Sequence, residues 1–364
     1  ETVAADNEYN GMGGTDTVDY SNRLAAIDVT LDGSNAASVT VGGSAEDTLR
    51  NIENVIGGAG ADTIIGDGGQ NVLLGGAGAD YIDGGAGNDT ITAQLLDNAA
   101  DEYLGGLGTD TLLIDASGNT IIDLHGGTVT QAGFAADIYS GGFENIIATA
   151  FDDVLIDDTA IINTIDLGAG ENTISFAGHT QDVIIDLTTE IDVGGTLYAQ
   201  ANIGGVDSDL ISGATHLIGG LADDTLTVGA GTQTIQGGAG NDEIFAGDGV
   251  DYIYGDAGND ILRGEAGNDF MYGGADDDTF FGGLGDDTME GGSGRDFMSF
   301  ADAAAGVSVD MNTLVGGYVQ VDHDGESDFI KEIEVIEGTS FDDTFFGNAA
   351  DNEFMGGDGN DVFR

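Results

Sequence analysis

The stretch from Gly237 to Ser299 reads GGAGNDEIF-AGDGVDYIY-GDAGNDILR-GEAGNDFMY-GGADDDTFF-GGLGDDTME-GGSGRDFMS. These consecutive segments share one nine-residue pattern, G-G-x-G-x-D-x-U-x, in which U is a large apolar residue. A short, fixed period of this kind is typical of solenoids, in which each repeat forms one small unit that stacks on its neighbours. The pattern therefore decides the fold class.

Two more runs of the same nonapeptide lie on either side of this stretch. Residues 57–92 read GGAGADTII-GDGGQNVLL-GGAGADYID-GGAGNDTIT, and residues 338–364 read GTSFDDTFF-GNAADNEFM-GGDGNDVFR. Position eight of the repeat is apolar in every copy, and it is occupied by Ile64, Leu73, Ile82, Ile91, Ile244, Ile253, Leu262, Met271, Phe280, Met289, Met298, Phe345, Phe354 and Phe363. A single G-x-G-x-D motif would be weak evidence for a repeat fold, but consecutive copies in register are a specific signal.

Each nonapeptide can be interpreted physically as a turn followed by a strand. The six Gly-rich residues favour a tight turn whose backbone carbonyls can point at an ion. The last three residues form a short strand that turns only position eight inward. Two nonapeptides then make one coil, and each Asp-bearing turn stacks on the turn two repeats later. We therefore expect an all-β parallel solenoid with ions between stacked turns, roughly eight ions in the three runs.

The charge of the chain points to cations as partners. The 364 residues include 67 Asp and Glu but only 6 Lys and Arg, for a net charge of −61. Such self-repulsion opposes compaction unless the acids are neutralised, and hard oxygen-ligated ions suit carboxylates best. The same charge argues against nucleic acid or anionic lipid as partners. A disordered acidic tail is excluded because 40% of residues are hydrophobic, and no stretch is apolar enough to predict membrane insertion.

A longer period underlies the short one. Four related segments are each followed by an alternating strand: GMGGTDTVDYS from Gly11, GGLGTDTLLID from Gly105, LGAGENTISFA from Leu167 and GGSGRDFMSFA from Gly291. We predict one continuous solenoid over residues 1–364, with sub-modules at about 1–104, 105–166, 167–290 and 291–364. The module interiors should contain longer strands and fewer ion-binding turns.

The nonapeptide resembles the repeat of the RTX, or hemolysin-type calcium-binding, proteins. The resemblance is specific over 57–92, 237–299 and 338–364 and looser elsewhere. It implies a right-handed parallel β-roll or β-helix with multiple structural Ca²⁺ ions in the Gly-Asp turns. It also implies passage of the unfolded chain through a type I secretion machinery of a Gram-negative bacterium, with folding outside the cell where calcium is high.

Carried over by motif position, the resemblance implies a set of calcium ligands. Backbone carbonyls of the Gly-rich loops would complete each shell around the position-six carboxylates of Asp62, Asp80, Asp89, Asp242, Asp251, Asp260, Asp269, Asp278, Asp287, Asp296, Asp343 and Asp361. Asn71 and Asn352 replace this Asp, so their sites should be weak or empty. Ser340 and Phe341 replace expected loop residues and put an ion there in doubt.

We find no catalytic motif in the sequence. There is no H-E-x-x-H and no G-x-S-x-G, there is no Cys, and the four His are scattered. Paired carboxylates could serve glycoside chemistry, but the repeat already accounts for nearly every pair. We therefore predict no enzymatic activity, no catalytic residues and no organic cofactor.

Two functions remain open at this stage. The first is a secreted structural solenoid of a bacterial surface layer, extracellular fibre, matrix or adhesin, which folds on binding Ca²⁺. The second is a calcium-dependent secretion and folding module of an RTX enzyme or toxin whose catalytic part lies outside this chain. Joining the end to the start gives GGDGNDVFR-ETVAADNEYNGMGGTDTV, which imitates the internal GGAGNDTITAQLLDNAADEYLGGLGTDTL. This similarity predicts that the solenoid continues past both ends or that copies associate head to tail.

Overall fold

The computed structural model describes residues 7–139, 142–157, 164–193, 196–349 and 351–364. These described residues form strands, turns and bends, with no helix among them. The chain divides into two compact units. The first comprises residues 1–172 with 209–213, and the second comprises residues 173–208 with 214–364. The prediction of an all-β fold is confirmed, while the predicted sub-module boundaries stay a prediction.

The first unit contains two sheets. Sheet 1 is formed by β1 (Asn7–Asn10), β3 (Ile27–Thr30), β4 (Ala37–Val41), β5 (Ser44–Arg50), β7 (Thr63–Ile65), β9 (Tyr81–Asp83), β11 (Glu102–Leu104), β13 (Thr120–Asp123), β14 (Thr128–Gln131), β15 (Asp137–Tyr139) and β17 (Val154–Ile156). Sheet 2 is formed by β2 (Thr17–Asp19), β6 (Asn54–Ile56), β8 (Val72–Leu74), β10 (Thr90–Gln94), β12 (Thr111–Asp115), β16 (Asn145–Ile147) and β18 (Thr164–Asp166). The unit boundary falls within two further strands, β19 (Asn172–Ser175) of sheet 1 and β22 (Val206–Ser212) of sheet 2.

The second unit is built in the same way. Its sheet 1 strands are β23 (Ala214–Ile218), β25 (Thr234–Ala239), β27 (Tyr252–Ala257), β29 (Phe270–Ala275), β31 (Thr288–Ser293), β33 (Ser308–Val315), β34 (Tyr318–His323), β35 (Glu326–Lys331), β37 (Thr344–Phe346) and β39 (Val362–Phe363). Its sheet 2 strands are β20 (Val183–Val193), β21 (Thr196–Ile203), β24 (Thr225–Thr227), β26 (Glu243–Phe245), β28 (Ile261–Ala266), β30 (Thr279–Leu284), β32 (Phe297–Ser299), β36 (Val335–Glu337) and β38 (Glu353–Met355).

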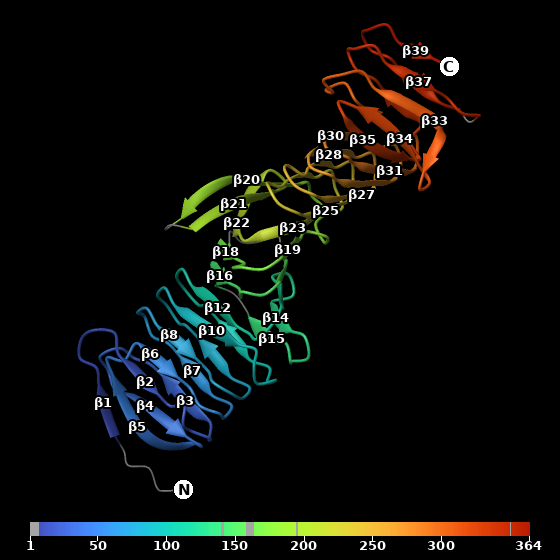
Figure 1. Cartoon of the computed structure of the whole chain (residues 1–364). Coiled ribbons are helices and arrows are strands. Elements are labelled where there is room, and N and C mark those ends of the chain that lie inside the picture. The colour runs from blue at the N-terminus through green and yellow to red at the C-terminus, as the bar shows by residue number, and fades with distance from the viewer. Residues whose placement is uncertain (1–6, 140–141, 158–163, 194–195, 350) are drawn as a thin grey trace. The chain divides into compact units, whose positions relative to one another are not determined.

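The nonapeptide runs form coils with parallel strands. Consecutive strands alternate between the two sheets, so that β7 pairs with β9 and β26 pairs with β28, both in parallel. The register joins Thr63 to Tyr81 and Glu243 to Ile261, which is a step of two nonapeptides. In Figure 1 the strands β6, β8, β10 and β12 follow one another as successive rungs. The predicted coil of two repeats is confirmed, and the chain forms a β-roll.

Position eight of the repeat fills the core, as predicted from strand alternation. Its side chains are almost completely buried from Ile64 through Phe345. The prediction is wrong for Phe363, which is 52% exposed, and Phe354 is only partly buried. Phe363 stacks on Phe345, with 5.3 Å between ring centroids, but no described coil covers its other side. Burial of position eight therefore requires a coil on both sides.

The long modules differ from the expected parallel coils. The strand trios β3–β4–β5, β13–β14–β15 and β33–β34–β35, and the pair β20–β21, are antiparallel. Two-residue turns with positive φ at both positions connect several of these strands, as at Gly316–Gly317 (φ 65° and 104°) and Asp324–Gly325 (φ 48° and 91°). Such dipeptides favour hairpin turns. Each module thus inserts a hairpin between two parallel coils.

Truncating a buried side chain at position eight should destabilise the protein strongly. Phe280 is completely buried, so Phe280→Ala should lower the free energy of unfolding in saturating calcium by about 3–5 kcal/mol. Leu284→Ala is the matched control, because Leu284 is 63% exposed, and its effect should stay within about 0.5 kcal/mol. Urea denaturation followed by circular dichroism measures both values. Equal effects would contradict the assignment of position eight to the core.

Candidate metal sites

The position-six Asp residues form continuous columns along the turns. In the second unit the backbone N–H of Asp242 donates to Oδ1 of Asp260 at 2.8 Å. The same bond recurs from Asp260 to Asp278 and from Asp278 to Asp296, at 2.9 Å each. Each carboxylate thus accepts the N–H of the equivalent residue one coil earlier. This bond holds one oxygen of every Asp in place and fixes the direction of the other.

The first unit contains equivalent columns. Asp62 donates its N–H to Asp80 Oδ1 at 2.7 Å, and Asp80 donates to Asp101 Oδ1 at 2.8 Å. On the alternate turns Asp89 donates to Asp110 Oδ1 at 2.8 Å. The columns therefore run through the nonapeptides and into the long modules.

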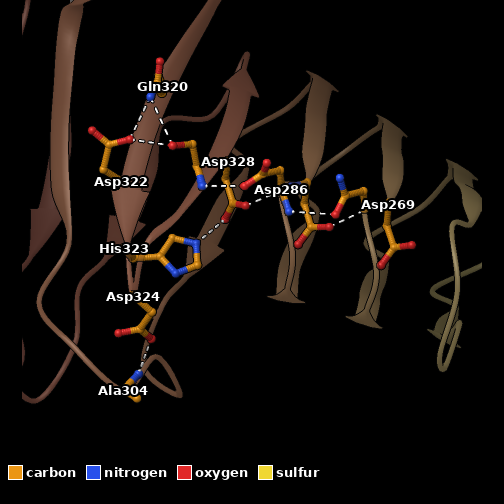
Figure 2. A network of polar contacts seen from close by, with 11 residues as sticks. Asp269, Asp286, Ala304, Gln320, Asp322, His323, Asp324 and Asp328 are labelled. Atoms are coloured by element: carbon orange, nitrogen blue, oxygen red, sulfur yellow. Dashed lines mark hydrogen bonds and ion pairs between the residues drawn. The ribbon is translucent and has the colours of Figure 1, made fainter.

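Figure 2 shows the end of one column of the second unit, where Asp328 lies beside His323. The N–H of Asp269 donates to Oδ1 of Asp287, whose own N–H donates to Asp328 Oδ1 at 3.0 Å. Asp328 Oδ2 then lies 2.9 Å from Nε2 of His323, and both side chains are buried. In the first unit the hydroxyl of Tyr103 lies between two carboxylates at the equivalent place, 2.8 Å from Oδ2 of Asp101 and 3.2 Å from Oδ2 of Asp137, and its single hydrogen can bond to either. Side chains from the modules therefore satisfy the carboxylates at the ends of the columns.

The second carboxylate oxygen of the central Asp residues has no partner. Among the described residues this holds for the buried Oδ2 atoms of Asp80, Asp89, Asp110, Asp242, Asp251, Asp260, Asp269, Asp278, Asp287 and Asp296. A buried carboxylate oxygen without a donor is costly unless a cation or proton compensates it. This regular set of oxygens fits a bound cation.

The same burial shifts the titration of these groups. Burial, the largest effect, raises the pKa of Asp80 and Asp287 to about 8 and that of Asp242 to about 7. Charge repulsion from neighbouring Asp residues of the column contributes to the same rise in pKa. The columns therefore resist ionisation when nothing neutralises them.

Glycine at the first position of most repeats keeps a space open beside these oxygens, and Ala246 takes this position in the repeat of Asp251. A methyl group on Gly273 would lie 2.2 Å from Asp278 Oδ2 and 2.6 Å from the carbonyl oxygen of Gly291. On Gly255 it would lie 2.3 Å from Asp260 Oδ2 and 2.7 Å from the carbonyl oxygen of Gly273. Carboxylate and carbonyl oxygens around one space are a donor set that suits calcium. The residues present therefore fit the ion, which would neutralise the carboxylates and tie adjacent coils together.

Three of the proposed ligands have different surroundings. Asp62 Oδ2 accepts the N–H of Gly58 at 2.6 Å, and Asp343 Oδ2 accepts that of Thr339 at 2.8 Å. These residues are the first of their runs, and both of their oxygens are used by the backbone. Asp361 accepts the N–H of Asp343 at 3.0 Å but is only partly buried. Their assignment as ligands stays a prediction.

The Asn residues at position six make different bonds. Asn71 Nδ2 donates to the carbonyl of Glu53 at 2.7 Å, while its Oδ1 accepts the N–H of Asp67 at 2.9 Å. Asn352 Oδ1 accepts the N–H of Asn348 at 2.8 Å. The expectation that both sites are weak or empty stays a prediction.

Several members of the columns were absent from the predicted ligand set. They are Asp101, Asp110, Asp137, Asp224 and Asp328. Asp110 and Asp224 are the sixth residues of the segments GGLGTDTLL (105–113) and GGLADDTLT (219–227), which resemble the nonapeptide, so counting positions within these segments would have found them. Asp137 and Asp328 lie within β15 and β35, where no local glycine pattern marks them.

Fold and site together define a cation-stabilised β-roll. A family model of the RTX calcium-binding nonapeptide repeat matches residues 56–91, 227–262, 263–298 and 332–363. The chain thus carries four copies of the RTX repeat and binds multiple Ca²⁺ ions through them. A search of curated proteins finds no match.

Side chains alone do not build a metal centre in the described part of the chain. No group of three or more His, Asp or Glu residues converges there. The described residues also include no helix long and apolar enough to cross a membrane.

Restoring the missing acid at position 71 should create a calcium site. Asn71→Asp removes the amide donor and places a carboxylate beside the carbonyl of Glu53, so we expect one additional bound calcium per chain. Equilibrium dialysis counts the ions. Asn88→Asp is the control, because it adds the same charge at an exposed position five and keeps the oxygen that accepts the N–H of Thr109. An equal count in both variants would contradict the assignment.

Proposed function

We propose that this protein is a secreted structural solenoid of a bacterial surface layer, extracellular fibre, matrix or adhesin. The unpartnered Oδ2 atoms in both units carry the proposal, because they give calcium a role in building the fold. Sites of the extracellular class have dissociation constants of about 10⁻⁴–10⁻³ M, so they would fill outside the cell and not in the cytosol. The energy of binding would then become folding energy after secretion.

Self-association head to tail is part of the proposal. In the coil formed by β38 and β39, the position-eight side chain of Phe363 is 52% exposed, and the outward-facing Met355 and Val362 are 39% and 38% exposed. An exposed core side chain and free strand edges favour the addition of a further coil. A second copy of the chain would supply such a coil, and repeated addition would give a fibre or lattice.

A secretion and folding module is the second candidate. The RTX repeats favour it equally, because in this family the repeats serve export and calcium-driven folding. In that case the catalytic part of an enzyme or toxin lies outside this chain, and the residues described above have no catalytic role.

Microscopy during a calcium titration separates the two candidates. The chain is taken from EDTA to several millimolar calcium and followed by size-exclusion chromatography and negative-stain microscopy. Fibres or sheets that appear together with folding would support the structural polymer. Isolated particles at every calcium concentration that folds the chain would rule out head-to-tail association and favour the module.

A further inference from the structure

At three places in the columns, the carboxylate that accepts the N–H of an Asp belongs to a glutamate instead of a further aspartate. The N–H of Asp110 donates to Glu144 Oε2 at 2.8 Å, in the position where the other turns place Asp Oδ1. The pairs Asp16–Glu53 and Asp296–Glu334 repeat this contact at 2.8 and 2.9 Å. Asp16, Glu53, Asp110 and Glu144 lie outside the segments that match the RTX repeat.

The backbone around the three pairs is the same. The carbonyl of Asp110 accepts the N–H groups of Glu144 and Asn145, at 3.1 and 2.9 Å. Asp16 and Asp296 accept the two equivalent N–H groups at 3.0–3.1 Å. The residue two positions before each Glu is left-handed, namely Asn51, Gly142 and Glu332, with φ of 48°, 82° and 56°. A geometry built three times at equivalent places indicates a defined site.

Each pair leaves a buried oxygen without a partner. The Oδ2 atoms of Asp16, Asp110 and Asp296 are buried and accept no hydrogen bond from the described residues. Asp110 and Asp296 are completely buried. A second carboxylate lies against each of them, so the arrangement concentrates negative charge without a donor to offset it.

A loop glycine opens space beside this oxygen. A methyl group on Gly291 would lie 2.4 Å from Asp296 Oδ2 and 2.0 Å from the carbonyl oxygen of Glu332. On Gly11 it would lie 2.3 Å from Asp16 Oδ2 and 2.2 Å from the carbonyl oxygen of Asn51. At these two sites the oxygens that surround the space therefore repeat the donor set of the nonapeptide turns. A methyl group on Gly105, the equivalent glycine before Asp110, would lie 2.1 Å from the carbonyl oxygen of Gly142.

The third module provides an internal comparison. Asn172 stands where the other modules have Asp16, Asp110 and Asp296. Its Oδ1 accepts the N–H of Asp153 at 2.8 Å, and its Nδ2 donates to the carbonyl of Gly213 at 2.9 Å. Gly213 is the left-handed residue of this module, equivalent to Gly142. In the third module the amide of Asn172 donates an N–H to the loop carbonyl. In the other three modules an Asp oxygen without a donor takes the place of this amide, and a cation is needed to compensate it.

We propose that the pairs Asp110–Glu144 and Asp16–Glu53 each bind a hard divalent cation of the calcium class, with the carbonyl oxygens of Gly142 and Asn51 as further ligands. Asp296–Glu334 with the carbonyl of Glu332 shows the same arrangement at the end of a nonapeptide run, where Asp296 is already a predicted ligand. The two module sites at Asp110 and Asp16 add to the ions of the nonapeptide turns and hold each inserted hairpin to the preceding coil. They do not depend on the proposed structural role.

Counting bound calcium in glutamate variants tests the proposal. Glu144→Gln keeps an oxygen for the N–H of Asp110 but removes the charge, so native mass spectrometry in calcium should show one ion fewer per chain. Glu53→Gln should also lose one ion, and the double variant two. Glu102→Gln is the matched control, because Glu102 is exposed on β11, and its count should equal that of the wild type.

Unchanged ion counts in both glutamine variants would overturn the proposal. If Glu144→Gln fails to regain its β-sheet signal in calcium, Glu53→Gln decides the question independently. Crystals of the unaltered chain grown with terbium give a second readout. Anomalous density beside Asp16 and Asp110 is expected, and its absence there with terbium in the nonapeptide turns would refute the module sites.

Discussion

Removal of calcium at neutral pH should unfold the chain, with loss of most of its β-sheet circular dichroism. The chain has a net charge of −61, and its Asp columns bury carboxylate oxygens that no described group compensates. Without a cation these carboxylates repel one another and carry the full cost of desolvation. Because several ions act on one set of stacked coils, the transition on adding calcium should be cooperative, with a midpoint of about 10⁻⁴–10⁻³ M.

Two controls separate specific binding from charge screening. Sodium chloride at matched ionic strength screens exposed charges but does not fill the turns, so it should not restore the signal. Magnesium prefers octahedral sites at about 2.0–2.1 Å and keeps its water molecules, so it should restore much less signal than calcium. A chain that stays folded in EDTA would show that the ions are dispensable.

The repeating part of the fold could be predicted because its cause is local. Nine residues suffice to define a turn, an inward side chain and an acid, so the register of β7 with β9 and the burial of Phe280 follow from the pattern. Because the units are alike, the way they stack on one another also follows from the repeat. The same reasoning predicted most of the column residues.

The rest depends on contacts between distant parts of the chain. The hairpins of the modules were missed, although Gly316–Gly317 and Asp324–Gly325 are hairpin dipeptides between alternating strands. Asp328 joins the column of Asp287 only because the β33–β34–β35 insertion returns its strand to sheet 1, 41 residues later. The exposure of Phe363 likewise reflects its neighbours and not its place in the repeat.

Acidification should restore β structure to the calcium-free chain. Burial raises the pKa of Asp242, Asp269 and Asp278 to about 7 in the folded coils, and that of Asp80 and Asp287 to about 8. In the unfolded chain an Asp titrates near 3.9. The folded state therefore binds more protons than the unfolded state between about pH 4 and pH 8.

The sign of the effect follows from this difference in bound protons. Because the folded pKa is raised, the contribution of each Asp to stability is fully present below its unfolded pKa and is lost as the pH rises through the folded value. Lowering the pH from 8 to 5 should thus stabilise the calcium-free β-roll, since protons take over the neutralising role of the ions. Calcium affinity should fall over the same range, because the carboxylates must lose those protons to bind.

Circular dichroism of calcium-free protein between pH 8 and pH 5 measures this effect. The β signal should increase progressively as the pH falls through 8 to 6, and added calcium should change it less at pH 5 than at pH 8. In the variant Asp269→Asn/Asp278→Asn, which carries neutral amides at two column positions, the pH dependence should be weaker. A calcium-free chain that remains equally unfolded at pH 5 and pH 8 would show that charge repulsion in the columns is not what keeps it open.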